Sequence, residues 1–466
     1  MLTITSIHVL GAGGGGVFGK VDGVTQRVVP AQGVPSGVEE VVLKPTSSEQ
    51  IFAIVRYCNE HYLPLCPQGG NTGHDGCSTS VHDETVISSG AMHTVHAFDE
   101  VLGVLTCDAG CILENLESHV NEFDHVMPLD LAAKGSCQIG GNLATGAGGI
   151  RLIHFGSLHA HVSGLEVVMA DGTIMSNLNV LRKDNSGLHL PHLFIGSEGT
   201  LGIITKAVIA CPTRPSESAL AFLACPDFDA CLRLLHQTRI TFQESLFSYE
   251  FIDRETLNCV IENMGVSSPL ATDYPGYILL EVAGSNAPGV LNERLLEFLD
   301  KSMSDGLISD GTVAADRKQA DALWQLREYG AEACLRDGYV YKFDFSLPGK
   351  KFNDITEATR QRLAGCKDVI RVVAFGHLGD GNVHLNISSA QKTPEIERLL
   401  FPWVYDWVMQ HGGSISAEHG IGLEKLEYMP RAKEAPYLRT MAAIKKTLDP
   451  KLILNPYKLY PPELLR

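Results

Sequence analysis

The stretch Leu63-Pro-Leu-Cys-Pro67-Gln-Gly-Gly-Asn-Thr-Gly73 joins a short apolar run to a loop with few large side chains. The apolar run at 63–67 predicts a strand. In the loop that follows, backbone N–H groups can hold a phosphate because few side chains block its approach. Alone, these glycines are also compatible with an ordinary turn.

Two more glycine-rich segments follow, at 134–149 and 194–205, and the second ends in an apolar run that predicts a buried strand. Three such segments in an alternating helix and strand pattern predict a long, phosphate-bearing cofactor held at several points. The glycine run at 11–16 matches G-x-G-x-x-G, but the residues after it do not predict the helix that this motif needs. We therefore predict an irregular leader at 1–37.

The length of the chain, 466 residues, predicts more than one domain. A capping box at Thr46-Ser-Ser-Glu49 predicts a helix whose apolar positions Ile51, Ile54, Val55 and Cys58 share one face. After residue 215 the sequence changes to longer amphipathic helices, at 227–237 and 292–303, and strands such as 277–282. We predict an α+β protein with the following parts: a leader at 1–37, a cofactor domain at 38–214, a second α+β domain at 215–445 and a C-terminal segment at 446–466 that returns to the first domain.

The composition excludes several classes of function. The chain has 44% hydrophobic and 20% charged residues, and its net charge is −17. No basic cluster offsets this charge, so nucleic acid is not an expected partner. No apolar run is long enough to span a membrane. The twelve cysteines form no C-x-x-C pair, which indicates buried, reduced thiols. A small anionic substrate would need a locally basic site.

A second informative stretch is Phe375-Gly-His-Leu-Gly-Asp-Gly-Asn-Val-His-Leu-Asn386. Asp380-Gly381 predicts a tight turn between two strands, so His377 and His384 can approach each other across a hairpin. His384 and Asn386 lie two residues apart and share a face of their strand. Alone, this spacing is also compatible with two loop histidines without a ligand.

The segment Ser416-Ala-Glu418-His419-Gly420 supplies a carboxylate and a further imidazole. Two imidazoles and one carboxylate form a three-ligand site with open positions, which is typical of a catalytic Zn²⁺ or Mn²⁺. We predict His377, His384 and Glu418 as metal ligands. A turn at Gly420 would leave His419 available as a general base.

These motifs together resemble a known family. They are Pro67–Gly73, Met127-Pro-Leu-Asp-Leu131, the segments at 134–149 and 196–205, the His377/His384 loop, Glu418-His419 and Asn455-Pro-Tyr-Lys458. In this order, over about residues 38 to 460, they resemble the FAD-linked D-2-hydroxy acid dehydrogenases of the vanillyl-alcohol-oxidase-type flavoprotein fold. The resemblance implies a two-part FAD-binding domain of the PCMH type, a substrate (cap) domain and a divalent metal, commonly Zn²⁺.

The resemblance also implies roles for individual residues. Arg327 and Lys342 would bind the distal carboxylate of a dicarboxylic substrate, His384 and Asn386 would contact the substrate, and His419 would be the catalytic base. The expected contacts with noncovalent FAD are Pro67, Gly69, Gly70, Asn71, Thr72, Gly73, Pro128, Gly135, Ser136, Gly140, Gly141, Asn142, Thr145, Gly148, Gly149, Glu198, Gly202, Ile204 and Asn455.

Several positions depart from the family pattern, most of them in the flavin half. His74-Asp-Gly-Cys77 stands where the family usually has apolar residues and glycine. A carboxylate at Asp75 would repel a pyrophosphate unless it points away from it. In the second domain Ala331 occupies the position of an expected threonine, which removes a hydroxyl contact.

The resemblance implies oxidation of a D-2-hydroxydicarboxylate, D-2-hydroxyglutarate to 2-oxoglutarate, with hydride transfer to the flavin. It also implies an electron-transfer flavoprotein as the acceptor and a mitochondrial matrix location, although no transit peptide is readable; otherwise the location would be cytoplasmic. Three alternatives remain open from the residues: a D-lactate or glycolate dehydrogenase of the same fold, a flavin-free metal-dependent hydrolase, and a flavin-binding sensor without turnover.

Overall fold

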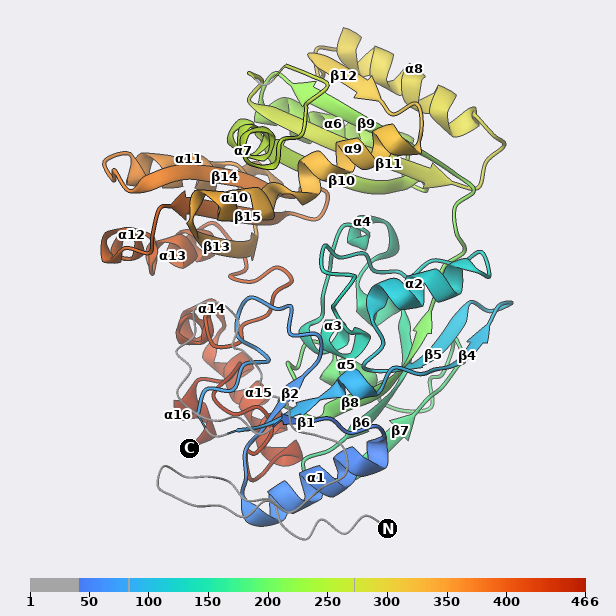
Figure 1. The fold of residues 1–466 in the computed structure, drawn as a ribbon, viewed down its shortest axis with the longest axis vertical. Coiled ribbons are helices and arrows are strands. Elements are labelled where there is room, and N and C mark those ends of the chain that lie inside the picture. The colour runs from blue at the N-terminus through green and yellow to red at the C-terminus, as the bar shows by residue number, and fades with distance from the viewer. Residues whose placement is uncertain (1–41, 83, 272) are drawn as a thin grey trace. The chain divides into compact units, whose positions relative to one another are not determined.

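The structure is a computed structural model that describes residues 42–466 except residues 83 and 272. The predicted leader at 1–37 lies outside the described residues. The described chain is an α+β protein and divides into two compact units (Figure 1). Unit 1 comprises the described residues up to 147 together with 157–214 and 419–466, and unit 2 comprises 148–156 and 215–418.

The division between the units falls at residue 214, where the sequence changes its composition. The chain returns to unit 1 at His419, whereas the sequence placed the C-terminal segment from 446. The short segment 148–156 groups with unit 2, although its first two residues are the end of the second glycine-rich segment. Two of the expected flavin contacts, Gly148 and Gly149, are therefore part of unit 2.

Unit 1 contains a small parallel sheet of order β1-β3-β2 and an antiparallel sheet of order β4-β5-β8-β6-β7. Its strands are β1 (Val42–Leu43), β2 (Leu65–Gln68), β3 (Thr85–Ser88), β4 (Val95–Asp99), β5 (Val104–Asp108), β6 (Val162–Val168), β7 (Ile174–Asn177) and β8 (Ile203–Ala210). Its helices are α1 (Ser48–His61), α2 (Leu113–Asn121), α3 (Ile139–Thr145), α5 (Pro191–Phe194), α14 (Met429–Ala432), α15 (Ala435–Leu448) and α16 (Pro462–Leu465).

Helix α1 confirms the predicted apolar face, because Ile51, Ile54, Val55 and Cys58 are all buried. Its capping box lies one residue later than the sequence placed it. Ser47 is the N-cap and accepts a hydrogen bond from the backbone of Gln50, whose side chain in turn accepts one from the backbone of Thr46. The third residue of the helix in a capping box can be a glutamate or a glutamine. The run Thr-Ser-Ser-Glu-Gln is therefore compatible with an N-cap at Thr46 or at Ser47.

Unit 2 is built on one antiparallel sheet of order β12-β9-β11-β10-β14-β15-β13 (Figure 1). Its strands are β9 (Glu217–Cys225), β10 (Leu246–Asp253), β11 (Gly276–Gly284), β12 (Asp310–Val313), β13 (Tyr339–Ser346), β14 (Val369–His377) and β15 (Asn382–Ser389). Its helices are α4 (Leu152–Phe155), α6 (Phe228–Thr241), α7 (Arg254–Met264), α8 (Val290–Ser304), α9 (Arg317–Glu328), α10 (Gly330–Asp337), α11 (Asp354–Leu363), α12 (Pro394–Leu400) and α13 (Trp403–Gln410). The predicted helices and the strand at 277–282 are confirmed.

The β14–β15 hairpin is the predicted one, with His377 at the end of β14 and the turn at Asp380-Gly381. Gly381 has φ 84°, and a Cβ there would lie 2.7 Å from the carbonyl oxygen of Leu347, so only glycine fits this turn. The antiparallel register continues into β13, where Asp344 lies opposite His384 and Lys342 lies opposite Asn386. Directly opposite residues share a face, so four polar side chains gather on one side of these strands.

Helices α7, α9 and α10 pack on the same side of the sheet, where Ile252, Leu326, Val373 and Phe375 form an apolar core. The polar side chains therefore continue an apolar face instead of facing solvent. The twelve cysteines are all free thiols and eleven of them are buried, as predicted. Among the described residues, no helix is both long and apolar enough to cross a membrane.

Candidate active site

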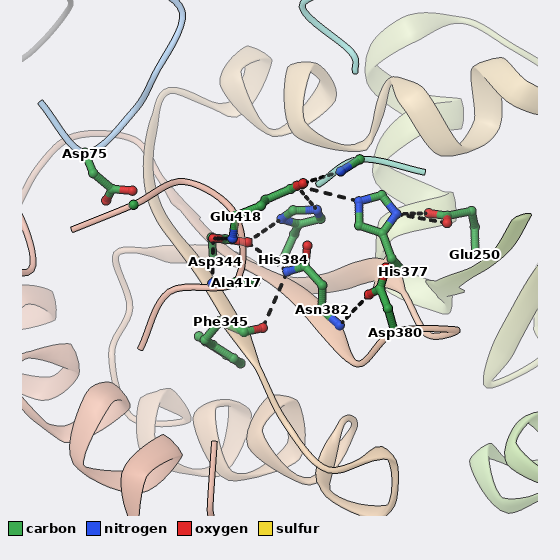
Figure 2. Close-up of polar contacts among 12 residues, drawn as sticks. Asp75, Glu250, Asp344, Phe345, His377, Asp380, Asn382, His384, Ala417 and Glu418 are labelled. Atoms are coloured by element: carbon green, nitrogen blue, oxygen red, sulfur yellow. Dashed lines mark hydrogen bonds and ion pairs between the residues drawn. The ribbon is translucent and has the colours of Figure 1, made fainter. Parts of the chain in front are cut away.

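The two predicted imidazoles in unit 2 meet at the carboxylate of Glu418. The Nε2 atoms of His377 and His384 lie 3.6 Å and 3.7 Å from Oε1 of Glu418. Their rings are nearly perpendicular, with centroids 5.3 Å apart. Figure 2 shows both rings turned toward this carboxylate. The structure thus brings together the three residues that the sequence predicted as metal ligands.

Each imidazole has a second carboxylate on its Nδ1 side. Glu250 of β10 lies 2.9 Å from Nδ1 of His377, and Asp344 of β13 lies 3.6 Å from Nδ1 of His384 (Figure 2). Asp344 also accepts hydrogen bonds from the side chain of Asn382 and from the backbone of Glu418. Carboxylates placed in this way fix the ring orientation and leave Nε2 for a ligand.

Glu418 is held by the backbone of the second glycine-rich segment. The N–H of Gly149 donates to Oε2 of Glu418 at 2.6 Å. A Cβ on Gly148 would stand 3.0 Å from the same oxygen, so a side chain there would crowd the carboxylate. This contact orients Oε1 toward the two imidazoles.

The distances from Glu418 to the two imidazoles are compatible with a metal ion. Tetrahedral bonds of about 2.0–2.2 Å place two ligand atoms about 3.3–3.6 Å apart, close to the separations found here. Within unit 2, the ligand atoms of Asp344, His384 and Glu418 also lie within 4.8 Å of one another; this group shares two residues with the predicted set and does not contain His377. Both oxygens of Asp344 already accept hydrogen bonds, so this residue is better suited to orient a ligand than to be one.

The charges of the site favour a positive charge between the carboxylates. Burial opposes ionisation of His377, but Glu250 and Glu418 outweigh it and raise the pKa of His377 to about 10. Burial would also raise the pKa of Glu418, but His377 outweighs it and lowers this pKa to about 2. Burial lowers the pKa of His384 to about 3, so this ring is neutral at pH 7 and can donate a lone pair.

The two predicted carboxylate-binding cations differ in their surroundings. Arg327 is 6% exposed, and its Nε donates to Oε2 of Glu250 at 2.8 Å. Lys342 is half-buried and has no carboxylate within ion-pair distance among the described residues; burial lowers its pKa. Lys342 therefore adds a positive charge to this face, whereas the charge of Arg327 is balanced by Glu250.

His419, the residue after Glu418, begins a loop of unit 1 that is tied down by several contacts. The carboxylate of Glu198 accepts hydrogen bonds from the backbone of Ile421 at 2.7 Å and Gly422 at 2.9 Å. The buried carboxylate of Asp75 pairs with Lys425 at 3.1 Å. Asp75 is the acidic residue that departs from the family pattern, and Lys425 balances its charge within the protein.

The three glycine-rich segments of unit 1 lie together. A Cβ on Gly70 would stand 2.2 Å from the carbonyl oxygen of Ser136, so the first two segments touch through their backbones. The third segment joins them, because the backbone of Gly196 donates to Leu143. At Gly73 and Gly141 no described atom lies within 4 Å of an added Cβ. This open backbone fits the approach of a phosphate-bearing cofactor.

Other expected flavin contacts have structural roles in unit 1. A Cβ on Gly202 would stand 2.4 Å from a side-chain methyl of Val167, so packing alone requires glycine there. The side chain of Asn455 donates to the carbonyl oxygens of Cys77 and Glu198. Ile204 is part of the apolar core, and the hydroxyl of Thr145 bonds to Gly141 of its own helix. The cofactor roles of these residues stay predictions.

Sequence reasoning missed Glu250 and Asp344. Glu250 interrupts the apolar strand Leu246–Asp253, in which every residue is buried, and a carboxylate in such a run indicates a paired charge. Asp344 lies two residues after Lys342 on the same face of β13, so strand alternation could have placed it beside the site.

The comparisons with known proteins agree with this fold and identify the family of the chain. Residues 40–176 match the family described as FAD binding domain, and residues 214–459 match FAD linked oxidases, C-terminal domain. The chain is 48% identical to D-2-hydroxyglutarate dehydrogenase, mitochondrial, of Danio rerio over 91% of this chain and 79% of that protein. It is 47% identical to the protein of that name from Bos taurus, over 91% of this chain and 77% of that protein.

The chain therefore belongs to the FAD-linked oxidase family that includes the D-2-hydroxyglutarate dehydrogenases, and it is an FAD-linked oxidoreductase. A solved structure of p-cresol methylhydroxylase superposes with a TM-score of 0.73 at 14% identity, covering 90% of this chain and 88% of that one. This likeness confirms the predicted PCMH-type fold. The family excludes the flavin-free hydrolase that the residues alone left open.

Proposed function

We propose that this enzyme oxidises D-2-hydroxyglutarate to 2-oxoglutarate. The observation that carries the proposal is the charged face of β13, β14 and β15, where the ammonium of Lys342 lies on the same face as His377 and His384. Lys342 has no carboxylate partner among the described residues, so it can bind a carboxylate of the substrate. Candidate metal ligands on the same face can bind a hydroxy acid, so the face suits a substrate with a hydroxy acid at one end and a second carboxylate at the other. The names of the relatives support the same substrate.

His377, His384 and Glu418 would hold a divalent cation, for which the two imidazoles and one carboxylate favour Zn²⁺. Bound FAD would supply the hydride acceptor, and a bound divalent cation would supply Lewis acidity toward the substrate hydroxyl. The open backbone at Gly73 and Gly141 would receive the pyrophosphate of noncovalent FAD. Within unit 2, Glu250 and Asp344 keep the two rings in position.

Asn386 and Lys342 would bind the carboxylates of the substrate. They lie directly opposite each other on β15 and β13, and Asn386 is two residues from His384 on the same strand. Lys342 supplies a net charge, and Arg327 supplies directed N–H groups whose charge is balanced by Glu250. Electrostatic binding on a half-buried face is stronger than in water, because the dielectric response is weaker there.

His419 would accept the proton of the substrate hydroxyl. It follows Glu418 in the chain, and its loop is held by Glu198, so its position is defined. His419→Asn should slow flavin reduction by D-2-hydroxyglutarate by about 10²–10⁴-fold, which is the usual contribution of a positioned base, and should retain metal and flavin. Stopped-flow absorbance and elemental analysis measure these quantities. Loss of the metal in this variant would identify His419 as a ligand instead.

A second candidate substrate is D-lactate. The chain is 43% identical to a putative D-lactate dehydrogenase of Schizosaccharomyces pombe, and Ala331 lacks the hydroxyl expected beside a dicarboxylate. The decisive experiment compares flavin reduction by D-2-hydroxyglutarate and D-lactate in the purified holoenzyme without oxygen. A higher kcat/KM for D-lactate would reject the dicarboxylate proposal.

The electron acceptor and the location complete the proposal. We infer an electron-transfer flavoprotein as the acceptor because the family resemblance implies one. We infer the mitochondrial matrix as the compartment, since the relatives carry mitochondrial names. Reoxidation of the substrate-reduced enzyme by a purified electron-transfer flavoprotein tests the first inference. Fractionation of cells that express the natural protein tests the second.

A further inference from the structure

We propose that Glu250 is a positioning residue that connects a metal ligand, His377, to a substrate cation, Arg327. The proposal rests on the function proposed above, because it assumes a metal at His377 and a dicarboxylate near Arg327. Glu250 is 1% exposed and lies within β10, one of the central strands of unit 2. Its carboxylate contacts both residues, which come from a neighbouring strand and from helix α9.

The contact with His377 determines which ring nitrogen is available to a metal. The Nδ1 atom lies 2.9 Å from the carboxylate of Glu250, and Nε2 faces Glu418. When the ring is neutral, an Nδ1–H group donates to Glu250 and the lone pair remains on Nε2. A carboxylate in this position also increases the basicity of the ring toward a metal.

The strand register makes this contact rigid. Phe251 pairs with Gly376 and Ile252 pairs with Phe375, so continuation of the antiparallel register places Glu250 opposite His377. A Cβ on Gly376 would stand 2.2 Å from the carbonyl oxygen of Asn382, so the backbone before His377 is closely packed. The carboxylate and the imidazole are therefore held by the sheet as well as by their hydrogen bond.

The contact with Arg327 acts at the same carboxylate. Nε and Nη2 of Arg327 both lie 2.8 Å from Oε2 of Glu250, but only Nε has the geometry of a hydrogen bond. Nη2 is buried and has no hydrogen-bond partner among the described residues. The guanidinium also lies over the ring of Phe375, 4.9 Å from its centroid. Glu250 thus holds the guanidinium in one orientation and leaves Nη2 able to donate to a ligand.

The simpler explanation is that Glu250 only neutralises a buried arginine. A residue with that role alone would affect stability, because loss of one partner leaves a buried charge without compensation. A positioning residue would also change the affinity for Zn²⁺. The two explanations therefore differ in metal affinity, which is measurable without turnover.

The first test is the Zn²⁺ affinity of purified Glu250→Gln, measured by competition with a chromophoric chelator. Glutamine keeps the shape of the side chain and removes its charge. We expect the affinity to fall about 10–100-fold, the usual effect of losing a carboxylate behind a metal-bound histidine. The KM for D-2-hydroxyglutarate should rise as well, since Arg327 loses its fixed orientation.

Asp253→Asn is the matched control. Asp253 is also a buried carboxylate of β10 and pairs with an arginine, Arg360, at 2.6 Å. It caps helix α7 and does not contact His377. This variant should lower the melting temperature and leave the Zn²⁺ affinity unchanged. Equal losses of Zn²⁺ affinity in both variants would overturn the proposal.

The double variant Glu250→Gln/Arg327→Met separates the two contacts and protects the test against misfolding. It removes both charges of a buried pair, which proteins often tolerate better than the loss of one. Low Zn²⁺ affinity in this variant supports a direct effect of Glu250 on His377. Recovery of the wild-type affinity would show that the single variant suffers only from the uncompensated charge of Arg327, and the proposal would be wrong.

The outcome is distinguishable from a failure of the proposed function. If the wild-type holoenzyme binds no stoichiometric divalent ion, the metal site itself is rejected. If the wild type binds Zn²⁺ and oxidises D-2-hydroxyglutarate, but Glu250→Gln binds Zn²⁺ equally well, only the role of Glu250 is rejected.

Discussion

The glycine-rich segments of unit 1 and the charged strands of unit 2 differ in the groups with which they would bind a negatively charged molecule. In unit 1 the open positions at Gly73 and Gly141 have backbone without side chains. In unit 2 the contacts are side chains on one face of a sheet, such as His384 and Lys342. Added side chains should therefore damage the first surface, and removed side chains should damage the second.

The largest effect is expected from the removal of a side chain from the charged strands of unit 2. His384→Ala should abolish both metal binding and activity, because a three-ligand site reduced to two holds a divalent ion weakly. Elemental analysis after dialysis, together with an activity assay, measures the result. His411→Ala is the control, since His411 bonds to the backbone of Trp407 within unit 2 and is outside the site. One retained equivalent of metal in His384→Ala would place the site elsewhere.

A smaller effect concerns the substrate. Lys342→Met should raise the KM for D-2-hydroxyglutarate about 10–100-fold, which corresponds to the loss of one charged hydrogen bond. Methionine keeps the length of the side chain and removes the charge. D-lactate has no distal carboxylate, so its kinetics should hardly change. Parallel losses for both substrates would show that Lys342 supports the fold or the hydroxy acid end.

In unit 1 we expect an added side chain at an open glycine to weaken cofactor binding. Gly141→Ala should stabilise the apoprotein slightly, because alanine favours the helix α3 by about 0.5–1 kcal/mol. The same methyl group should weaken FAD binding about tenfold, since it occupies the open side of the backbone. Isothermal titration of the apoprotein with FAD measures the affinity.

Alanine substitutions at two other glycines are the controls for the FAD affinity and stability of Gly141→Ala. A Cβ at Gly365 meets nothing within 4 Å, so Gly365→Ala should leave FAD affinity unchanged. Gly70→Ala should destabilise the fold, since its Cβ would stand 2.2 Å from a carbonyl oxygen. If Gly141→Ala binds FAD normally, the cofactor does not approach this part of the backbone.

The smallest effect concerns a charged group in unit 1 that only supports the fold. Glu166 accepts hydrogen bonds from Ser48, Thr205 and Lys206. Burial would raise the pKa of Glu166, but these contacts outweigh it and lower the pKa. The ionised form therefore stabilises the folded state above a pH of about 4.5, and this contribution is lost as the pH falls through the lower folded pKa.

Glu166→Gln should consequently reduce the free energy of unfolding by about 1–2 kcal/mol at pH 7, and the difference should shrink as the medium becomes acidic. Urea titrations of the wild type and the variant across this pH range measure the effect. Glu60→Gln is the control, because Glu60 forms an exposed pair on helix α1. Metal affinity should not change in either variant. A change would show that unit 1 also uses charged side chains for the site.

Local sequence determined several features without help from the rest of the chain. The buried face of α1 follows from helical spacing, and the β14–β15 turn follows from Asp380-Gly381. The three candidate ligands were predictable because two belong to this hairpin and Glu418 lies in a short, recognisable segment. The cap of α1 was placed one residue too early, because consecutive serines and threonines offer similar hydrogen bonds.

Tertiary structure alone decided which groups surround these ligands. Glu250 reaches His377 through strand pairing between β10 and β14, which are more than a hundred residues apart in the chain. Asp75 meets its cation at Lys425, and Gly149 gives its N–H to Glu418. Burial makes such pairs strong and specific, but the sequence does not encode which distant segments will lie side by side. Spacing within a segment therefore predicted the candidate ligands, and only the packing of distant segments revealed the carboxylates beside them.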